Sequence, residues 1–407
     1  MEKSYALNAT LGLSQAFYPS NTLFQVQGII PNTHVYWVEE AAGGTPQVSS
    51  SSILRSYDGE TWESGSDATL NSQHPCVYFK VSEHGQELWD LTGNSTGWGL
   101  VSDQPYKVSG RLRDFTINTS SNKPRNYIHL FGGEWKEAAG HADKLTEAKY
   151  LILDSTEGCT FGSMFRGCVN LLETPILNTT TMVENLYYLM FAGCTSLRTV
   201  AALPTTVAEN CYKSMFQGCT NLVNMPALPA TTLAIGCYQG MFAGCSKLEN
   251  AISTLPALSL PQECYKNMFY GCTSLQIPPT IAATNYATVG SSYGDYACDS
   301  MFYGCSNLIK IPKLKITSLP YWVYHSMFGG CSKLKFSTTQ TDEYQYEYRI
   351  PETGTGAPNT GFTATQVAVG MIAGTGGTYT GDTYSTGVGT VSYVPINTTI
   401  YTANEVI

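Results

Sequence analysis

The chain has 407 residues, of which 43% are hydrophobic and only 13% are charged, about half the usual share of charge. With 22 basic and 31 acidic residues, its net charge of −9 argues against a nucleic-acid-binding protein, because such a protein needs a concentrated basic surface. No apolar run approaches the roughly 18 residues of a membrane span. The first eight residues lack the basic and apolar regions of a secretory signal, so we expect a chain made without export or one whose signal has been removed.

The N-terminal part of the chain predicts short strands. Residues 1–40 alternate short apolar runs with turn residues such as Pro19, which is typical of an extended or β arm, and we expect this arm to serve attachment or oligomerisation. In residues 41–110, alternating patterns around the Asp58-Gly59 turn predict a small antiparallel β-sandwich domain.

The next segment, residues 111–158, is expected to cap the structure that follows. Residues 135–148 are amphipathic and rich in Ala, Glu and Lys, which predicts a helix. The Leu-Phe-Gly-Gly of residues 130–133 resembles a degenerate copy of a repeat, 34 residues before Met164. Such a cap would cover the apolar end of a repeat array.

Residues 159–335 contain seven copies of one octamer, Met-Phe-x-Gly-Cys-x-x-Leu. The copies follow one another in steps of 26, 25, 26, 27, 33 and 26 residues, and begin at Met164, Met190, Met215, Met241, Met268, Met301 and Met327. A period in this range predicts stacked repeats, that is, a solenoid. Equivalent side chains should then form columns along the stack, with Phe165, Phe191, Phe216, Phe242, Phe269, Phe302 and Phe328 in one and Cys168, Cys194, Cys219, Cys245, Cys272, Cys305 and Cys331 in another.

The chemistry of the 13 cysteines depends on this arrangement. In a parallel column the Cβ atoms point in the same direction, which favours buried free thiols over disulfides. No zinc-type spacing of Cys and His occurs, so a metal site has the least support. We therefore expect the cysteines from Cys159 to Cys331 to be free and mostly buried, with disulfides and metal as the alternatives.

Residues 336–407 are interpreted as an insertion, an eighth degenerate repeat and a C-terminal cap. Residues 367–375 carry the eighth copy, with Ile372 in place of Phe and Thr375 in place of Cys. Terminal repeats are often atypical in this way.

Residue types that could support catalysis are scattered. His325 stands where other copies have Gly, Tyr, Lys, Gln or Asp, so we expect it to face solvent, and His141 has no partner at metal-ligand spacing. Asp342, Glu343 and Glu347 are expected to form a solvated loop and not a glycosidase pair. We expect no enzyme, no cofactor and no metal.

Tyrosine is abundant, with 27 residues, and offers contact area with a polar tip. One interpretation is a partner-binding face formed by Tyr270, Tyr286, Tyr293, Tyr296 and Tyr303. The alternative is a solenoid surface that uses tyrosine in place of charge.

The octamers resemble BspA-type leucine-rich repeats. The best match is residues 207–276, with Cys211-Tyr212, Cys237-Tyr238 and the Pro-Ala-Leu-Pro-Ala-Thr-Thr-Leu of residues 226–233. This variant is similar to surface proteins of gut bacteria and virion proteins of their phages, and residues 55–62 look like the hairpin of a small β domain in those proteins. The resemblance implies a mostly β fold, with a leucine-rich-repeat solenoid that serves as an adhesive or structural scaffold.

From these features we expect a non-enzymatic bacteriophage virion structural protein, such as a head fibre, a capsid-decorating protein or a tail fibre. It would be made in the host cytoplasm, bind other virion proteins through residues 1–40 and form a dimer or trimer. A host surface glycan or protein would be a further partner. The alternatives are a secreted bacterial cell-surface adhesin and, less favoured, a carbohydrate-active enzyme with accessory repeats.

Overall fold

A computed structural model describes residues 24–39, 53–81, 98–113, 130–132, 142–155, 161–287, 296–359, 363–386 and 389–407. These residues are mostly β-structure and turns, and none of them lies in an α-helix, as the expected mostly β class requires. The chain forms two compact units. The first comprises Met1–Met182 with Gly193–Pro204, and the second comprises Val183–Ala192 with Thr205–Ile407.

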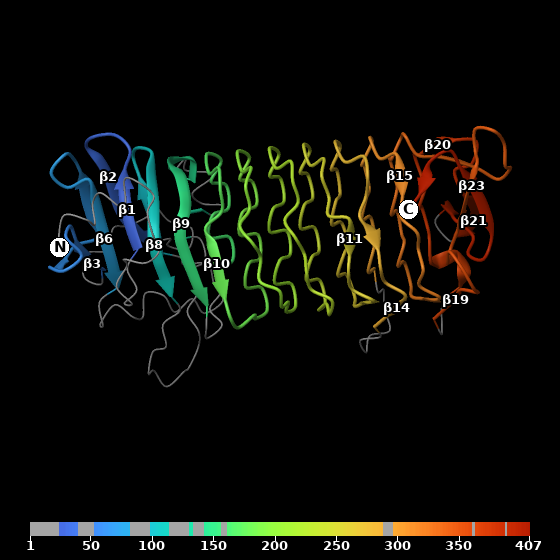
Figure 1. Ribbon diagram of the computed structural model, residues 1–407, viewed down its shortest axis with the longest axis horizontal. Coiled ribbons are helices and arrows are strands. Elements are labelled where there is room, and N and C mark those ends of the chain that lie inside the picture. Colours follow the sequence, from blue (N-terminus) through green and yellow to red (C-terminus); the bar gives the residue numbers. More distant parts are fainter. Residues whose placement is uncertain are drawn as a thin grey trace. The chain divides into compact units, whose positions relative to one another are not determined.

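The first unit contains two sheets (Figure 1). The larger sheet has the strand order β10-β9-β8-β1-β6-β3-β4, and the smaller has the order β5-β2-β7. The strands are β1 (Phe24–Gly28), β2 (Thr33–Glu39), β3 (Ile53–Ser56), β4 (Glu63–Ser64), β5 (Asp67–Leu70), β6 (Cys76–Val81), β7 (Trp98–Ser102), β8 (Tyr106–Arg113), β9 (Leu145–Ser155) and β10 (Ile176–Thr179), with one 3-10 turn, η3 (Ala142–Lys144).

Apolar side chains paired across strands form the core of this unit. Val26 lies opposite Val77 on one side and Val108 on the other, and all three are buried. In the smaller sheet, Val35 pairs with Ala68, and both are again buried. Cross-strand contacts of this kind are the main source of sheet stability, so β1 and β2 are integral to the unit.

The expected arm at residues 1–40 is therefore wrong over residues 24–39. β1 lies between β6 and β8, and β2 lies between β5 and β7. The partners of β1 are about 50 and 80 residues away in sequence, so local patterning could not reveal the pairing. Residues 1–23 lie outside the described residues.

The helix expected at residues 135–148 is also wrong over its described part. After η3 the chain enters β9, which pairs in parallel with β8 on one side and β10 on the other. Irregularities in the β8–β9 register place Leu145, Ala148 and Leu151 at buried positions. Their spacing of three imitates a helix face, because bulges interrupt the period of two that marks a regular strand.

Phe131 occupies the place of a repeat phenylalanine before Phe165. Its ring stacks on Phe165 at 5.2 Å, and its backbone N–H donates to Met164 O at 2.9 Å. Phe131 is buried, in keeping with a degenerate unit at residues 130–133.

Each repeat of the second unit contributes a turn-rich corner that begins five residues before its Met. Alternate N–H groups of this corner donate to the next repeat, as in Tyr212 N to Cys237 O at 3.0 Å and Phe216 N to Met241 O at 2.9 Å. The intervening N–H groups donate three residues back within the same repeat, as in Met215 N to Tyr212 O at 3.1 Å. The two sets of bonds together pair successive N–H groups of the corner, as burial of backbone requires.

The octamer glycine makes this corner possible. All seven octamer glycines have φ between 69° and 75°, a conformation that glycine adopts at little cost. A Cβ atom on Gly244 would lie 3.7 Å from the Cα atom of Gly218, so the corner backbones of neighbouring repeats pack closely.

Aromatic columns fill the core of the second unit. Consecutive rings of the Phe column (Phe191, Phe216, Phe242, Phe269, Phe302 and Phe328) stack at 5.4 to 5.9 Å. A second column (Tyr187, Tyr212, Tyr238 and Tyr265) stacks at 5.6 to 6.3 Å. All these rings are buried.

Short strands form the remainder of the second unit, with one 3-10 turn, η4 (Ala364–Gln366). Parallel pairs join β11 with β13, β12 with β14, β15 with β24, β16 with β19 and β17 with β20, whereas β23 pairs antiparallel with β17 and β18, and β21 with β22. The strands are β11 (Thr254–Leu255), β12 (Ser259–Leu260), β13 (Thr280–Ile281), β14 (Asn285–Tyr286), β15 (Lys310–Ile311), β16 (Ser318–Leu319), β17 (Lys335–Ser337), β18 (Tyr346–Arg349), β19 (Ala357–Pro358), β20 (Gly376–Gly377), β21 (Asp382–Thr386), β22 (Gly389–Tyr393), β23 (Thr399–Thr402) and β24 (Glu405–Val406).

Residues 367–375 make the contacts expected of an eighth repeat. Phe328 N donates to Met371 O and Gly330 N donates to Ala373 O, at 2.8 and 2.7 Å, as between octamer repeats. Thr375 differs from the octamer cysteines, because its hydroxyl donates within its own turn to Ile372 O at 2.7 Å.

Candidate functional site

Two exposed tyrosines lie side by side at the corner of the repeats. Tyr270 and Tyr303 each follow the octamer Phe, and their rings stack at 5.0 Å with an angle of 7°. They are 43% and 38% exposed. A Cβ atom on Gly329 would lie only 2.7 Å from the ring of Tyr303, so the glycine of the next repeat leaves the space that this ring occupies.

An open pocket of about 220 Å³ borders Tyr270. Its residues come from three successive repeats, with Lys213 and Gln217 in one, Gln239 and Ala243 in the next, and Tyr270 in the third. The small side chain of Ala243 stands between the larger ones of Gln217 and Tyr270 at equivalent positions. A polar pocket with one aromatic wall is thus present on the tyrosine-bearing corner.

A second aromatic cluster forms around Tyr296. Its ring meets those of Tyr321 and Trp322 edge-on at 6.3 and 5.4 Å, and the last two rings stack on each other at 4.9 Å. The ammonium group of Lys266 lies 4.4 Å from the centre of the Tyr296 ring, within cation–π range.

Charged side chains line up beside this cluster. Lys266 Nζ lies 2.8 Å from Glu263 Oε1 and 3.9 Å from Asp299 Oδ2, and Asp299 Oδ1 lies 2.8 Å from His325 Nδ1. The His325 ring also stacks on Trp322 at 4.4 Å. These contacts use groups at the same corner of three consecutive repeats.

His325 is less exposed than the sequence predicts. Its side chain is 26% exposed, because Asp299 and Trp322 cover it. The variety of residues at equivalent positions indicated tolerance of different side chains, but Asp299 in the preceding repeat gives this histidine a partner.

Of the five predicted partner-binding tyrosines, the four that the structure describes differ in their contacts. Tyr270 and Tyr303 stack together, whereas Tyr296 belongs to the second aromatic cluster. Tyr286 lies in β14 with its hydroxyl buried, and Tyr293 lies outside the described residues. Sequence reasoning missed Lys213, Gln217, Gln239, Tyr321 and Trp322, which a comparison of equivalent positions across the repeats could have indicated.

The predicted Phe and Cys columns are both buried, and the cysteines serve packing. The octamer residues Phe165, Phe191, Phe216, Phe242, Phe269, Phe302, Phe328, Cys168, Cys194, Cys219, Cys245, Cys272, Cys305 and Cys331 are fully inaccessible to solvent. The described cysteines are thiols, and Cys159 lies outside the described residues. Burial raises the pKa of Cys245 and of Cys331 to about 12, so these thiols stay protonated and unreactive at neutral pH.

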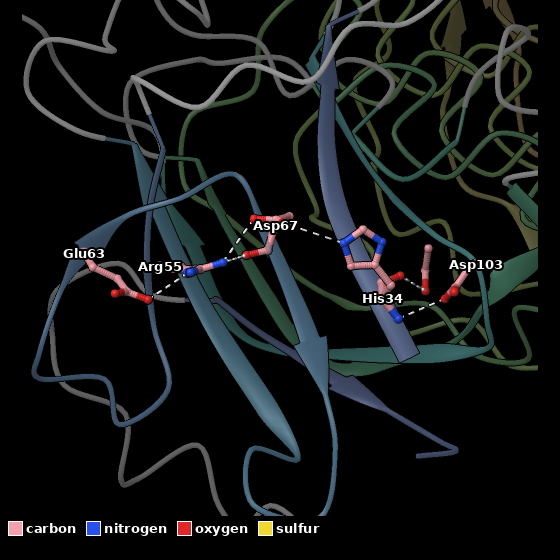
Figure 2. A network of polar contacts seen from close by, with 6 residues as sticks. His34, Arg55, Glu63, Asp67 and Asp103 are labelled. Atoms are coloured by element: carbon pink, nitrogen blue, oxygen red, sulfur yellow. Dashed lines mark hydrogen bonds and ion pairs between the residues drawn. The ribbon is translucent and has the colours of Figure 1, made fainter. Parts of the chain in front are cut away.

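A polar network in the first unit connects strands of its two sheets (Figure 2). Arg55 on β3 binds Glu63 Oε1 through Nε at 2.9 Å and Asp67 Oδ1 through Nη1 at 3.0 Å. Asp67 Oδ2 lies 3.4 Å from His34 Nε2, and Asp103 accepts the His34 backbone N–H at 2.9 Å. Because Arg55 pairs with carboxylates on two different strands, we interpret this network as a connection between strands.

The remaining candidate groups that the structure describes are exposed or paired with an opposite charge. Glu343 pairs with Lys335 at 2.9 Å, and Asp342 and Glu347 are exposed, while His141 lies outside the described residues. Over the ranges that the structure covers, no cluster of three or more His, Cys, Asp or Glu side chains could hold a metal ion. Within the same ranges, no helix has the length and apolar character of a membrane span.

Comparison with known proteins identifies the repeats. A family model described as BspA type leucine rich repeat region matches residues 162–293 in six copies. The searches of curated proteins and of solved structures found no match. The resemblance seen in the octamers is confirmed for this range, and the octamers at Met301 and Met327 lie beyond it.

Proposed function

We propose that this chain, which carries BspA-type leucine-rich repeats over residues 162–293, is a non-enzymatic structural protein of a bacteriophage particle. It would be a head fibre, a capsid-decorating protein or a tail fibre, and its repeats would form a solenoid that presents an adhesive surface. The BspA-type family indicates a surface repeat protein with adhesive repeats. The assignment to a phage particle goes beyond what the family indicates.

The distribution of residue types supports a scaffold. The repeated Met, Phe, Cys and Leu side chains are buried, while Tyr270, Tyr303 and the pocket beside them face solvent. A repeat array can vary its exposed residues without disturbing the columns, since each repeat contacts mainly its neighbours. Recognition by surface residues is therefore a better use of this fold than catalysis.

The reduced cysteines favour a virion protein over a secreted adhesin. Cys219, Cys245 and Cys272 each donate a thiol hydrogen bond to a phenylalanine carbonyl of the preceding repeat, at 3.1 Å. A disulfide sulfur has no hydrogen to donate, so the packing uses the reduced form. Chains made in the cytoplasm of a host cell fold in a reducing environment, whereas secreted chains meet oxidising conditions.

Attachment to other virion proteins is assigned to the N-terminal unit, in place of an isolated arm. Residues 24–39 supply two of its strands, so a partner would meet a folded domain. We also propose a dimer or trimer, because linked sites strengthen weak individual contacts through effective concentration.

Mass spectrometry of purified phage particles, with immunogold labelling in electron micrographs, tests the virion role. We expect the intact chain in the particle fraction and label on its exterior. Recovery from the envelope of uninfected bacteria, with none on particles, would overturn the proposal and favour the cell-surface adhesin.

A further inference from the structure

We propose that the pocket beside Tyr270 binds an acidic sugar unit of a surface glycan, one pyranose ring carrying a carboxylate. The inference rests on the adhesive role proposed above and names its ligand class. All residues involved belong to the second unit.

The shape of the pocket follows from one column of equivalent positions. Gln217, Ala243 and Tyr270 each follow the octamer Phe in three successive repeats. Ala243 forms a low floor between two higher walls, and the walls are two repeats apart, on the order of 10 Å at the usual strand spacing. The volume of about 220 Å³ corresponds to about seven water molecules, roughly the space of one monosaccharide.

Tyr270 supplies an apolar wall of fixed orientation. Its ring stacks on Tyr303, which belongs to the following repeat, so the opposite ring face is directed toward the preceding repeats and the pocket. A pyranose ring presents a face of C–H groups that packs on such an aromatic surface. Because the stack already orders the ring, binding costs little side-chain entropy.

Carboxamide groups supply hydrogen bonds for hydroxyls. Gln217, Gln239 and Asn267 all line the pocket. Gln239 Oε1 is buried and has no hydrogen-bond partner among the described residues. A buried acceptor without a partner costs free energy, and a turn of the Gln239 side chain toward the pocket would let a sugar hydroxyl satisfy it.

Lys213 determines the preferred charge of the ligand. No carboxylate lines the pocket, and Lys213 has no ion pair with any of the described residues. The lysine two repeats later, Lys266, is by contrast held by Glu263 and Asp299. A cation beside hydrogen-bonding groups and an aromatic face, with no carboxylate in the lining, favours a sugar carboxylate.

Binding to the purified full-length protein tests the site by calorimetry or ligand-observed NMR. The probes are 3′-sialyllactose, trigalacturonic acid and neutral lactose, and lactose is the uncharged match of the first. We expect at least one acidic probe to bind at least tenfold more tightly than lactose, and its affinity to fall as salt increases. Failure of both acidic probes to bind, or equal binding of lactose, would overturn the proposal.

Matched variants test whether the acidic probe binds in the pocket beside Tyr270. Tyr270→Ala and the space-filling Ala243→Leu should each weaken the acidic probe at least tenfold, and Lys213→Gln should remove the preference over lactose. Tyr188→Ala and Lys247→Gln change exposed residues that do not line the pocket and should leave binding unchanged. Unaltered binding by Tyr270→Ala or Ala243→Leu, in variants with normal melting curves, would contradict the site.

These measurements are independent of where the protein resides. Absence of the chain from phage particles would remove the virion role and leave sugar binding intact. Particles that carry the chain, together with a purified protein that binds neither acidic probe, would retain the virion role and reject the sugar site.

Discussion

The thiol of Cys245 donates a hydrogen bond to the backbone carbonyl of Phe216, one repeat earlier, at 3.1 Å. The same bond recurs from Cys305 to Phe269 and from Cys331 to Phe302, at 3.1 and 3.0 Å. The octamer cysteines are therefore connected to the preceding repeat by their own sulfur atoms. A residue that looks like a redox or metal ligand in the sequence acts here as a small buried donor.

Thiol reactivity should report this burial. In native protein at pH 8, we expect the thiols of the Cys column to resist a disulfide-exchange reagent, because they are inaccessible and protonated. Half-buried Cys76 should react first among the described cysteines. Denaturation without reductant should expose about 13 reactive thiols. Five or six disulfides in their place would show that the cysteines do not form a column of thiols and that the chain does not fold in a reducing compartment.

Stability should fall in alkaline solution. Burial raises the pKa of Cys211 and Cys245 to about 12 in the folded chain, whereas the pKa of an unfolded thiol is about 8.5. The unfolded state therefore loses its protons first, so the contribution is complete below about pH 8.5 and is lost as pH rises toward 12. Urea unfolding midpoints at pH 7, 9 and 10.5 should decrease in that order, and an unchanged midpoint at pH 10.5 would count against the prediction.

The Phe column should be much more sensitive to substitution than its exposed neighbours. Phe216→Ala or Phe242→Ala should lower the free energy of unfolding by about 3–5 kcal/mol, through lost burial and the cavity left behind. Gln217→Ala changes an exposed side chain next to Phe216 and should stay within about 0.5 kcal/mol. Denaturant titration measures all three, and similar losses for Phe216 and Gln217 would show that the assigned orientation is wrong.

N-terminal truncations should show that the two units melt in separate transitions. Removal of residues 1–23 leaves β1 and β2 intact, whereas removal of residues 1–40 deletes both strands, with Val26 and Val35. We expect the longer truncation to lose the melting transition of the first unit and to keep that of the second, since repeats are stabilised mainly by their neighbours. Two unchanged transitions in the protein of residues 41–407 would mean that β1 and β2 are dispensable.

The repeats were predictable because each position of the repeat recurs several times in the sequence. One Met-Phe-x-Gly-Cys copy would be weak evidence, but seven copies reveal which residues are buried together, and the Phe and Cys columns follow. The identity of the buried positions thus came from self-similarity and not from local propensity.

Features that depend on distant pairing were not predictable in the same way. β1 is placed by β6 and β8, and the spacing of Leu145 and Ala148 imitates a helix because β9 is irregular. The pocket was missed for another reason. It arises from Gln217, Ala243 and Tyr270, which are neighbours across the repeats and far apart along the chain.

The interval between Met268 and Met301 is 33 residues, against 26 for the next interval, yet the corner bonds are the same. Gly271 N donates to Tyr303 O across the longer interval, and Gly304 N donates to Gly329 O across the shorter one, both at 2.7 Å. Extra residues are thus accommodated between corners without a change in how the corners meet. A gene that duplicates or deletes one whole period by unequal recombination would encode a longer or shorter array held by the same bonds, so the reach of such a protein can evolve separately from its stability.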